Sequence, residues 1–292
     1  MKQFAPHDLT VRKVPFEFPD TIDPVWHPAE PEFGHMVSGA SVTMPYLEPF
    51  LIRTMREGLK QVDEPGLIQD CQGFMAQEGQ HFQNHRKFND LLKKKAYPGL
   101  EQYEKAMGAD FVRYNQTKSL KWRLAYTAGF ETMSIGLTHW LVEERGELFQ
   151  GADPIVTSLV LWHMIEEIEH KTVAIDLYRY LYPRSYFMRL YGIFFASLHI
   201  MRYSKLSYRE MLKVDGRWTD KKSRKRLIKM VRRFFLGIGP IMLKGMLPGH
   251  HPSHIKDPDW VDEWKAAYQA MGEDAVPLLD TQDPEIPAQF AV

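Results

Sequence analysis

The chain has 292 residues, enough for one large domain or two smaller ones, and its 37 Lys and Arg balance 37 Asp and Glu. This balance argues against a nucleic-acid-binding protein, which normally carries an excess of basic residues. A single cysteine, Cys71, excludes an intramolecular disulfide, and the N-terminal stretch lacks the apolar run of a secretory signal. We therefore expect a protein of the reducing cytoplasm.

Proline-bearing segments without helical periodicity stand at both ends of the chain. Residues 1–40 contain six prolines and are predicted to form an extended arm over the main body. Residues 274–292 are predicted to form a C-terminal tail, either loose or strapped to the body. Between these ends we expect a helical bundle over residues 41–182 and a helical extension over residues 183–273.

Four long segments carry apolar residues at steps of three and four, which is the pattern of one face of an α-helix. They cover approximately residues 46–62, 66–95, 117–149 and 154–182. Asp63–Gly66 is predicted to turn the chain between the first two, and Pro154 is favourable at the first position of the fourth. Each apolar stripe is interrupted by an acid or a histidine. A buried carboxylate is costly unless it is paired, neutralised or bound to a metal.

The interrupting residues follow the order Glu, Glu-x-x-His, Glu, Glu-x-x-His, with one element on each predicted helix. They are Glu48, Glu78, His81, Glu131, Glu167 and His170. A spacing of i,i+3 places Glu and His on the same helical face. This pattern is typical of di-iron and di-manganese centres in four-helix bundles. Hard oxygen donors without thiolates favour two iron ions, with manganese as the alternative, over structural zinc.

A competing interpretation is that Glu78 and Glu167 are solvated acids and that the histidines are ordinary core residues. Two further acids, Glu166 and Glu169, lie among the proposed ligands. Glu166 stands about 100° around the helix from Glu167, as the helical period requires. We therefore interpret both as non-ligands, with part of this acid facing solvent.

Three of the candidate residues have a context that needs comment. Glu48 precedes Pro49, and a residue before proline is disfavoured in the α region, so the first helix is predicted to begin or kink there. His85 lies one turn beyond His81, and His163 lies one turn before Glu167. Each is a candidate for an outer partner of a ligand or for an additional ligand. An ordinary core or surface histidine is the alternative for both.

The extension contains a strongly basic segment. Residues 221–233 carry eight Lys or Arg and no acid, and an apolar stripe continues into the residues that follow. A basic amphipathic helix can lie on an anionic membrane, which makes residues 221–240 a candidate for peripheral membrane contact. The alternative is a helix packed on the bundle with a solvated basic face. Residues 186–201 are too short and interrupted to span a bilayer, and we expect them to shield an apolar substrate channel.

Three stretches resemble a bacterial family of predicted metal-dependent hydrolases. They are MAQEGQHFQNHRKFND at 75–90, AGFETMSIGL at 128–137 and WHMIEEIEHKTVAIDLY at 162–178. The resemblance covers roughly residues 25–260. It implies an all-α, ferritin-like four-helix bundle with additional C-terminal helices, and it implies the same six metal ligands.

Metal binding leaves the reaction open. The all-helical carboxylate cage favours an oxidoreductase, a non-haem di-iron oxidase or oxygenase that uses O₂ on a small, apolar substrate. A hydrolase with a metal-bridging water is the first alternative, and it is the one that the family's name favours. Iron storage or peroxide disproportionation is the second alternative. The sequence also leaves open whether the chain forms a homo-oligomer.

Overall fold

The structure, a computed structural model, describes residues 9–272 and 275–290, so residues 1–8 of the predicted arm and residues 274 and 291–292 of the predicted tail lie outside it. The described chain is all-helical, as predicted. An isolated antiparallel bridge between Leu279 and Phe290 is the one β-type pairing in this part. The helices are α1 (Pro31–Ser41), α2 (Met44–Leu59), α3 (Pro65–Lys95), α4 (Leu100–Thr117), α5 (Leu120–Glu143), α6 (Arg145–Phe149), α7 (Pro154–Glu169), α8 (Val173–Leu181), α9 (Tyr186–Val214), α10 (Lys221–Met246), the 3₁₀ turn Pro252–His254 and α11 (Trp260–Met271).

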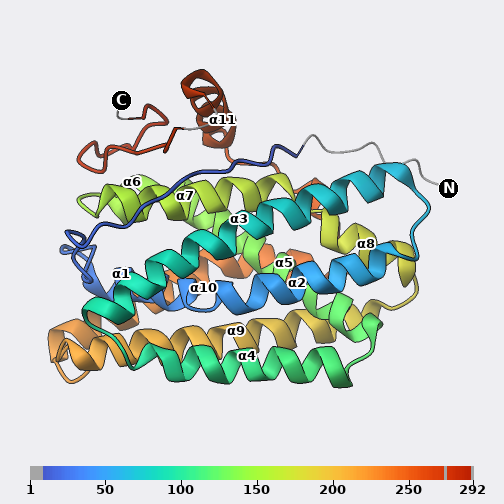
Figure 1. Cartoon of the computed structure of the whole chain (residues 1–292), viewed down its shortest axis with the longest axis horizontal. Helices are drawn as coiled ribbons and strands as arrows, with labels where there is room; N and C mark the ends of the chain where they lie inside the picture. Colours follow the sequence, from blue (N-terminus) through green and yellow to red (C-terminus); the bar gives the residue numbers. More distant parts are fainter. Residues whose placement is uncertain (1–8, 273–274, 291–292) are drawn as a thin grey trace.

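Helices α2, α3, α5 and α7 form the central bundle (Figure 1). Helix α3 contacts α2 and α7, and α5 contacts the same two helices, so the four close a ring. Their apolar stripes meet inside it, where Leu51, Phe74 and Leu124 are fully buried in one continuous cluster. Burial of this apolar surface stabilises the ring. The four helices are those that carry the predicted metal ligands.

Helix α2 begins at Met44 and continues through Pro49, so the prediction that it begins at Glu48 is wrong. Pro49 has no amide proton to donate to the carbonyl of Pro45. Arg86 compensates, because its Nη2 donates to that carbonyl at 3.4 Å. Proline therefore falls inside the second turn without ending the helix, and Glu48 has a helical position from which it points into the bundle.

Other helix boundaries also differ from those expected. Helix α1 occupies the last part of the predicted arm, with Pro31 in its first turn, where a fixed φ favours helix. Helix α4 was not predicted, because its buried stripe of Met107, Phe111 and Tyr114 is narrow and the rest of it is polar. The third predicted segment divides into α5 and α6. The fourth ends at Glu169 and resumes as α8, because the amide of Val173 donates to the carbonyl of His170 in a tighter turn.

Both ends of the described chain are fastened to the bundle (Figure 1). The N-terminal arm runs along α3 and α7, where Asn84 Nδ2 donates to the carbonyl of Val14 at 3.3 Å. Near the C-terminus, the amide of Leu279 donates to Ser158 Oγ at 2.9 Å, which straps the tail to α7. The arm in particular covers the side of the bundle where the two Glu-x-x-His elements lie.

Helices α9 and α10 pack on α5 outside the ring. The approach of α9 is very close, because a Cβ on Gly129 would lie 2.3 Å from the carbonyl carbon of Gly192. Glycine is therefore required at this crossing. Within the described residues, neither of these helices nor any other has an apolar stretch sufficient to cross a membrane.

Candidate metal centre

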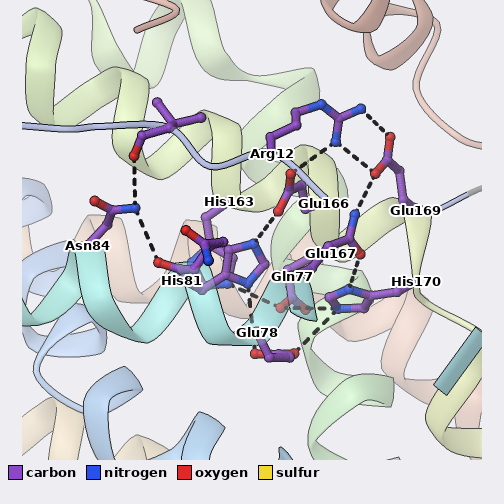
Figure 2. A network of polar contacts seen from close by, with 12 residues as sticks. Arg12, Gln77, Glu78, His81, Asn84, His163, Glu166, Glu167, Glu169 and His170 are labelled. Atoms are coloured by element: carbon purple, nitrogen blue, oxygen red, sulfur yellow. Dashed lines mark hydrogen bonds and ion pairs between the residues drawn. The ribbon is translucent and has the colours of Figure 1, made fainter. Parts of the chain in front are cut away.

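The bundle brings all six predicted ligands to one buried place. Figure 2 shows Glu78, His81, Glu167 and His170 among them. Helix α2 supplies Glu48, α3 supplies Glu78 and His81, α5 supplies Glu131, α7 supplies Glu167, and His170 follows α7 directly. None of the six is more than 3% exposed. The i,i+3 spacing on α3 and at the end of α7 turns each Glu-x-x-His pair toward the bundle axis.

Two groups of side chains each bring their ligand atoms within 4.8 Å of one another. One group consists of Glu48, His81 and His163, and the other of Glu78, Glu167 and His170. Glu131 borders the second group, with Oε2 3.6 Å from Nε2 of His170. His163 is therefore placed to act as an additional ligand. The sequence had also allowed an outer partner or an ordinary core histidine.

Glu78 lies between the two groups. Its Oε1 is 3.5 Å from Nε2 of His170, and its Oε2 is 3.8 Å from Nδ1 of His81. A carboxylate that presents one oxygen to each imidazole has the orientation of a bridge between two cations. The side chain is fully buried, so no solvent competes for either oxygen.

Most of the candidate ligand atoms lack hydrogen-bond partners, although they are buried. This holds for both oxygens of Glu48, Glu78 and Glu131, for Oε2 of Glu167, for Nδ1 of His81 and for Nε2 of His170. Buried polar atoms are normally paired, and an uncompensated buried carboxylate is strongly unfavourable. Cations coordinated by these atoms would satisfy all of them together, so the donor set fits two metal ions.

Without a cation between them, the ionised forms of these buried carboxyl groups are unfavourable. Burial raises the pKa of Glu48 and Glu131 well above their ordinary values, and the neighbouring carboxylates raise it further. Burial also raises the pKa of Glu78. Burial acts on Glu167 in the same direction, but His170 and His163 outweigh it and hold the pKa of Glu167 well below its usual range. The four groups cannot all be ionised in this space unless positive charge joins them.

The metal-free protein is expected to lose stability as the pH rises from 6.5 toward 10. Burial lowers the pKa of His81, but Glu166 and Glu78 outweigh burial and raise it from 6.5 to about 10. The folded state therefore keeps a proton that the unfolded chain releases, and Glu48 and Glu131 act in the same direction. The free energy of unfolding should fall by about 1.4 kcal/mol per pH unit for each group that titrates.

Denaturant unfolding at several pH values measures this effect. Bound metal displaces the protons, so the metal-loaded protein should show a flatter profile over the same range. A metal-free protein whose stability is constant or rises in this window would contradict the assignment.

The imidazole of His81, on α3, is oriented by Glu166 of α7, the helix that also carries Glu167. Its Nε2 is 2.9 Å from Oε2 of Glu166, which leaves Nδ1 facing the centre. Glu166 is fully buried, so the expectation that part of this acid faces solvent is wrong for it. Its negative charge is matched by Arg12 of the N-terminal arm, whose Nη1 donates to Oε1 of Glu166 at 3.0 Å (Figure 2).

The imidazole of His170 is held through the same arm. Its Nδ1 is 3.1 Å from Oε1 of Gln77, and Nε2 of Gln77 donates to Glu169 at 2.8 Å. Glu169 in turn accepts from both terminal nitrogens of Arg12, at 2.9 Å and 2.8 Å. Arg12 thus anchors the outer partners of both imidazoles. Such outer partners fix ring orientation and tautomer at metal sites.

His163 and His85 form a chain of rings that leads away from the centre. Nε2 of His163 is 3.1 Å from Oε1 of Glu167, and its Nδ1 is 2.7 Å from Nε2 of His85. Nδ1 of His85 is 2.8 Å from Oγ of Ser41. His85 belongs to neither ligand group, and it contacts His163 on the ring nitrogen opposite the one that faces Glu167.

An apolar pocket of about 330 Å³ reaches the centre. His85, His163 and Glu167 line its inner part, and the remaining walls are mainly apolar side chains from α1, α5, α9 and α10. Pockets of this size are typical of small-molecule sites. Lys205 is the one Lys or Arg among the described lining residues.

Comparison with known proteins supplies a family. A family model described as a predicted metal-dependent hydrolase matches residues 10–256. No curated protein and no solved structure matches the chain. The family match overturns the expectation of an oxidoreductase and favours the hydrolase that was its alternative. The matched range includes the arm, the bundle and helices α9 and α10, and the chain therefore belongs to the family of predicted metal-dependent hydrolases.

Proposed function

We propose that the protein hydrolyses a carboxylic ester or amide with an apolar acyl or alkyl part, using two metal ions held in the bundle. The observation that carries this proposal is the set of unpaired buried carboxylate and imidazole atoms, which includes Oε2 of Glu167, a residue that also lines the apolar pocket. Two metal ions held by these atoms would lower the pKa of a bound water and would polarise a substrate carbonyl, which is the chemistry that hydrolysis needs. Family membership supports the same reaction class.

The protein's own residues supply ligation, orientation and exclusion of water. Glu167 and His163 belong both to the ligand groups and to the pocket lining, so a substrate that fills the pocket places its reacting end beside them. The apolar walls exclude bulk water and favour a substrate with a hydrocarbon part. Lys205 is the one Lys or Arg among the lining residues, so apart from the metal ions the pocket offers little positive charge to a phosphoester.

We further propose that the metals are iron or manganese and that the bundle is of the ferritin-like type. Each ion would be bound by several carboxylates and by one or two imidazoles. A donor set of this kind suits iron and manganese. Two Glu-x-x-His elements and two single glutamates on four helices support the ferritin-like type.

Hydrolysis of p-nitrophenyl esters tests the proposal. The protein is stripped with a chelator and reloaded with Fe(II) under anaerobic conditions or with Mn(II). We expect no turnover without metal and recovery on reloading. The kcat/KM should rise about fourfold for each added methylene until the pocket is filled, because each buried methylene contributes about 0.8 kcal/mol.

p-Nitrophenyl phosphate serves as the comparison substrate and should be turned over poorly or not at all. Equal ester hydrolysis by stripped and reloaded protein would contradict the proposal. Faster turnover of the phosphate than of any carboxylic ester would contradict the assigned substrate class.

A further inference from the structure

Exposed apolar side chains are concentrated on two helices. Of the twelve large hydrophobic residues that are exposed in the described part of the chain, ten lie on α9, on α10 or at the residue that follows α10. The most exposed is Phe187, at 82%. Others on this surface are Phe194, Leu198, Leu236, Leu243 and Leu247. Single exposed apolar residues are ordinary, but a contiguous group of this kind marks a binding surface.

The two helices present these residues on the same side of the molecule. On α5, Gly129 meets α9, while Gly136 and Thr132 meet α10. Residues three and four apart lie on one face of a helix, so α9 and α10 cover the same face of α5. The end of α10 also touches the start of α9, because Arg189 Nη2 donates to the carbonyl of Leu247 at 2.9 Å. Their outer faces therefore form one surface, which we call the α9/α10 face.

The α9/α10 face is basic where it is not apolar. Residues 221–246 contain no Asp or Glu. Arg226 pairs with Glu32, and Arg233 pairs with Glu144. The exposed cations of α10 that no described acid pairs with include Lys222, Lys225, Lys229 and Arg232. Most of the exposed cations of α10 lie in its first half, together with Ile228, and most of its exposed apolar residues lie in its second half, together with Lys244.

The charge of this face indicates an anionic partner rather than a second copy of the chain. A symmetric dimer through the same patch would bring one basic α10 helix against another. An anionic lipid surface offers opposite charge to the cations and hydrocarbon to the apolar residues. A helix that lies in a membrane interface needs both.

The pocket opens on this face. Its outer lining includes Met201 and the exposed Lys205 from α9, and Val231 and the 51% exposed Phe235 from α10. A surface bound to the α9/α10 face would therefore lie at the mouth of the pocket. From there the mainly apolar walls lead inward to Glu167.

We propose that the α9/α10 face docks on an anionic lipid bilayer and that the pocket takes an amphiphilic ester or amide from that bilayer. The docking stands on the exposed residues and charges alone, whereas the nature of the substrate rests on the proposed hydrolytic function. The helices lie in the interface and do not cross it, in agreement with their lack of a membrane-spanning stretch.

Vesicle flotation tests the docking. Vesicles of phosphatidylcholine mixed with phosphatidylglycerol should carry the full-length protein, and phosphatidylcholine alone should carry much less. The variant Lys225→Gln with Lys229→Gln should bind about fivefold more weakly for each charge removed. Arg53→Gln with Lys60→Gln removes one exposed charge of α2 and one that directly follows it, and should bind like the wild type.

The triple variant Phe187→Ser, Leu198→Ser and Leu243→Ser tests the apolar residues of the α9/α10 face. It should lose binding to the anionic vesicles. Val112→Ser, at a residue of α4 that is 56% exposed, is the control and should retain it. Equal binding by the triple variant and the wild type would overturn the proposal. A wild-type dimer that the triple variant converts to a monomer, without vesicle binding by either, would show a self-association surface instead.

Hydrolysis of a water-soluble short-chain ester separates the two proposals. The vesicle-binding variants should retain it, because none of the changed residues lines the pocket or the metal centre. Vesicle binding without any metal-dependent hydrolysis would leave the docking intact and refute the proposed function.

Discussion

Replacing Glu78 with glutamine is expected to reduce tightly bound metal from about two ions per chain to fewer than one. Glu78 presents one oxygen toward His81 and the other toward His170, and both oxygens lack a hydrogen-bond partner. Glutamine keeps the shape of the side chain but removes its charge and one acceptor. Both ligand groups should therefore lose affinity together, and ester hydrolysis should fall with them.

The matched control is Glu104→Gln. Glu104 is also buried, but it lies on α4 and pairs with Lys93 at 2.6 Å. This control should retain the full metal content, measured by elemental analysis after desalting. Unchanged metal content in the Glu78→Gln variant, with its helical content intact, would refute the bridging position.

Replacing Arg12 with methionine is expected to destabilise the protein by about 3–5 kcal/mol. Arg12 is 5% exposed, and its guanidinium pairs with both Glu166 and Glu169. Its removal takes the guanidinium charge from a fully buried carboxylate, to which His81 stays bound at 2.9 Å. Because Glu166 orients His81 and Glu169 holds Gln77 against His170, metal affinity should fall about 10- to 100-fold as well.

Lys87→Met is the control for the Arg12→Met variant. Lys87 also ties the arm to α3, through a 3.2 Å bond to the carbonyl of Phe16, but it does not contact Glu166. This change should have little effect on metal affinity. Chemical denaturation and competition with a metal chelator measure the two quantities. If Arg12→Met matched the control in both, the arm would have no part in supporting the centre.

The candidate metal ligands could be placed on their helices from sequence, because the spacing that groups them is local. Glu78 with His81, and Glu167 with His170, share a helical face through a spacing fixed by the helix itself. Each single glutamate could be placed on its helix by the apolar stripe around it. The structure brings these residues together, as the repeated pattern predicts.

The outer partners could not be predicted, because they depend on contacts between distant parts of the chain. Arg12 meets Glu166 across 154 positions of sequence, from an arm with no periodicity to place it. The helical period separates Glu166 correctly from the face of Glu167, but it cannot show that Glu166 meets His81 of another helix. His163 carried a usable signal, since it precedes Glu167 by one turn and so shares its face.

The reaction class could not be predicted from the candidate ligands, because the same donors support oxidation and hydrolysis. A cage of carboxylates and imidazoles fixes the charge of the site, whereas the family description favours hydrolysis and the mainly apolar pocket favours an apolar substrate. The ferritin-like type stays a prediction, since no solved structure matched the chain.

The metal content of the purified chain tests the central claim most directly. Elemental analysis after anaerobic loading with Fe(II) or with Mn(II) and removal of loosely bound ions is expected to give about two ions per chain. A chain that retains neither metal in stoichiometric amount would contradict a two-metal centre at Glu48, Glu78, His81, Glu131, Glu167 and His170.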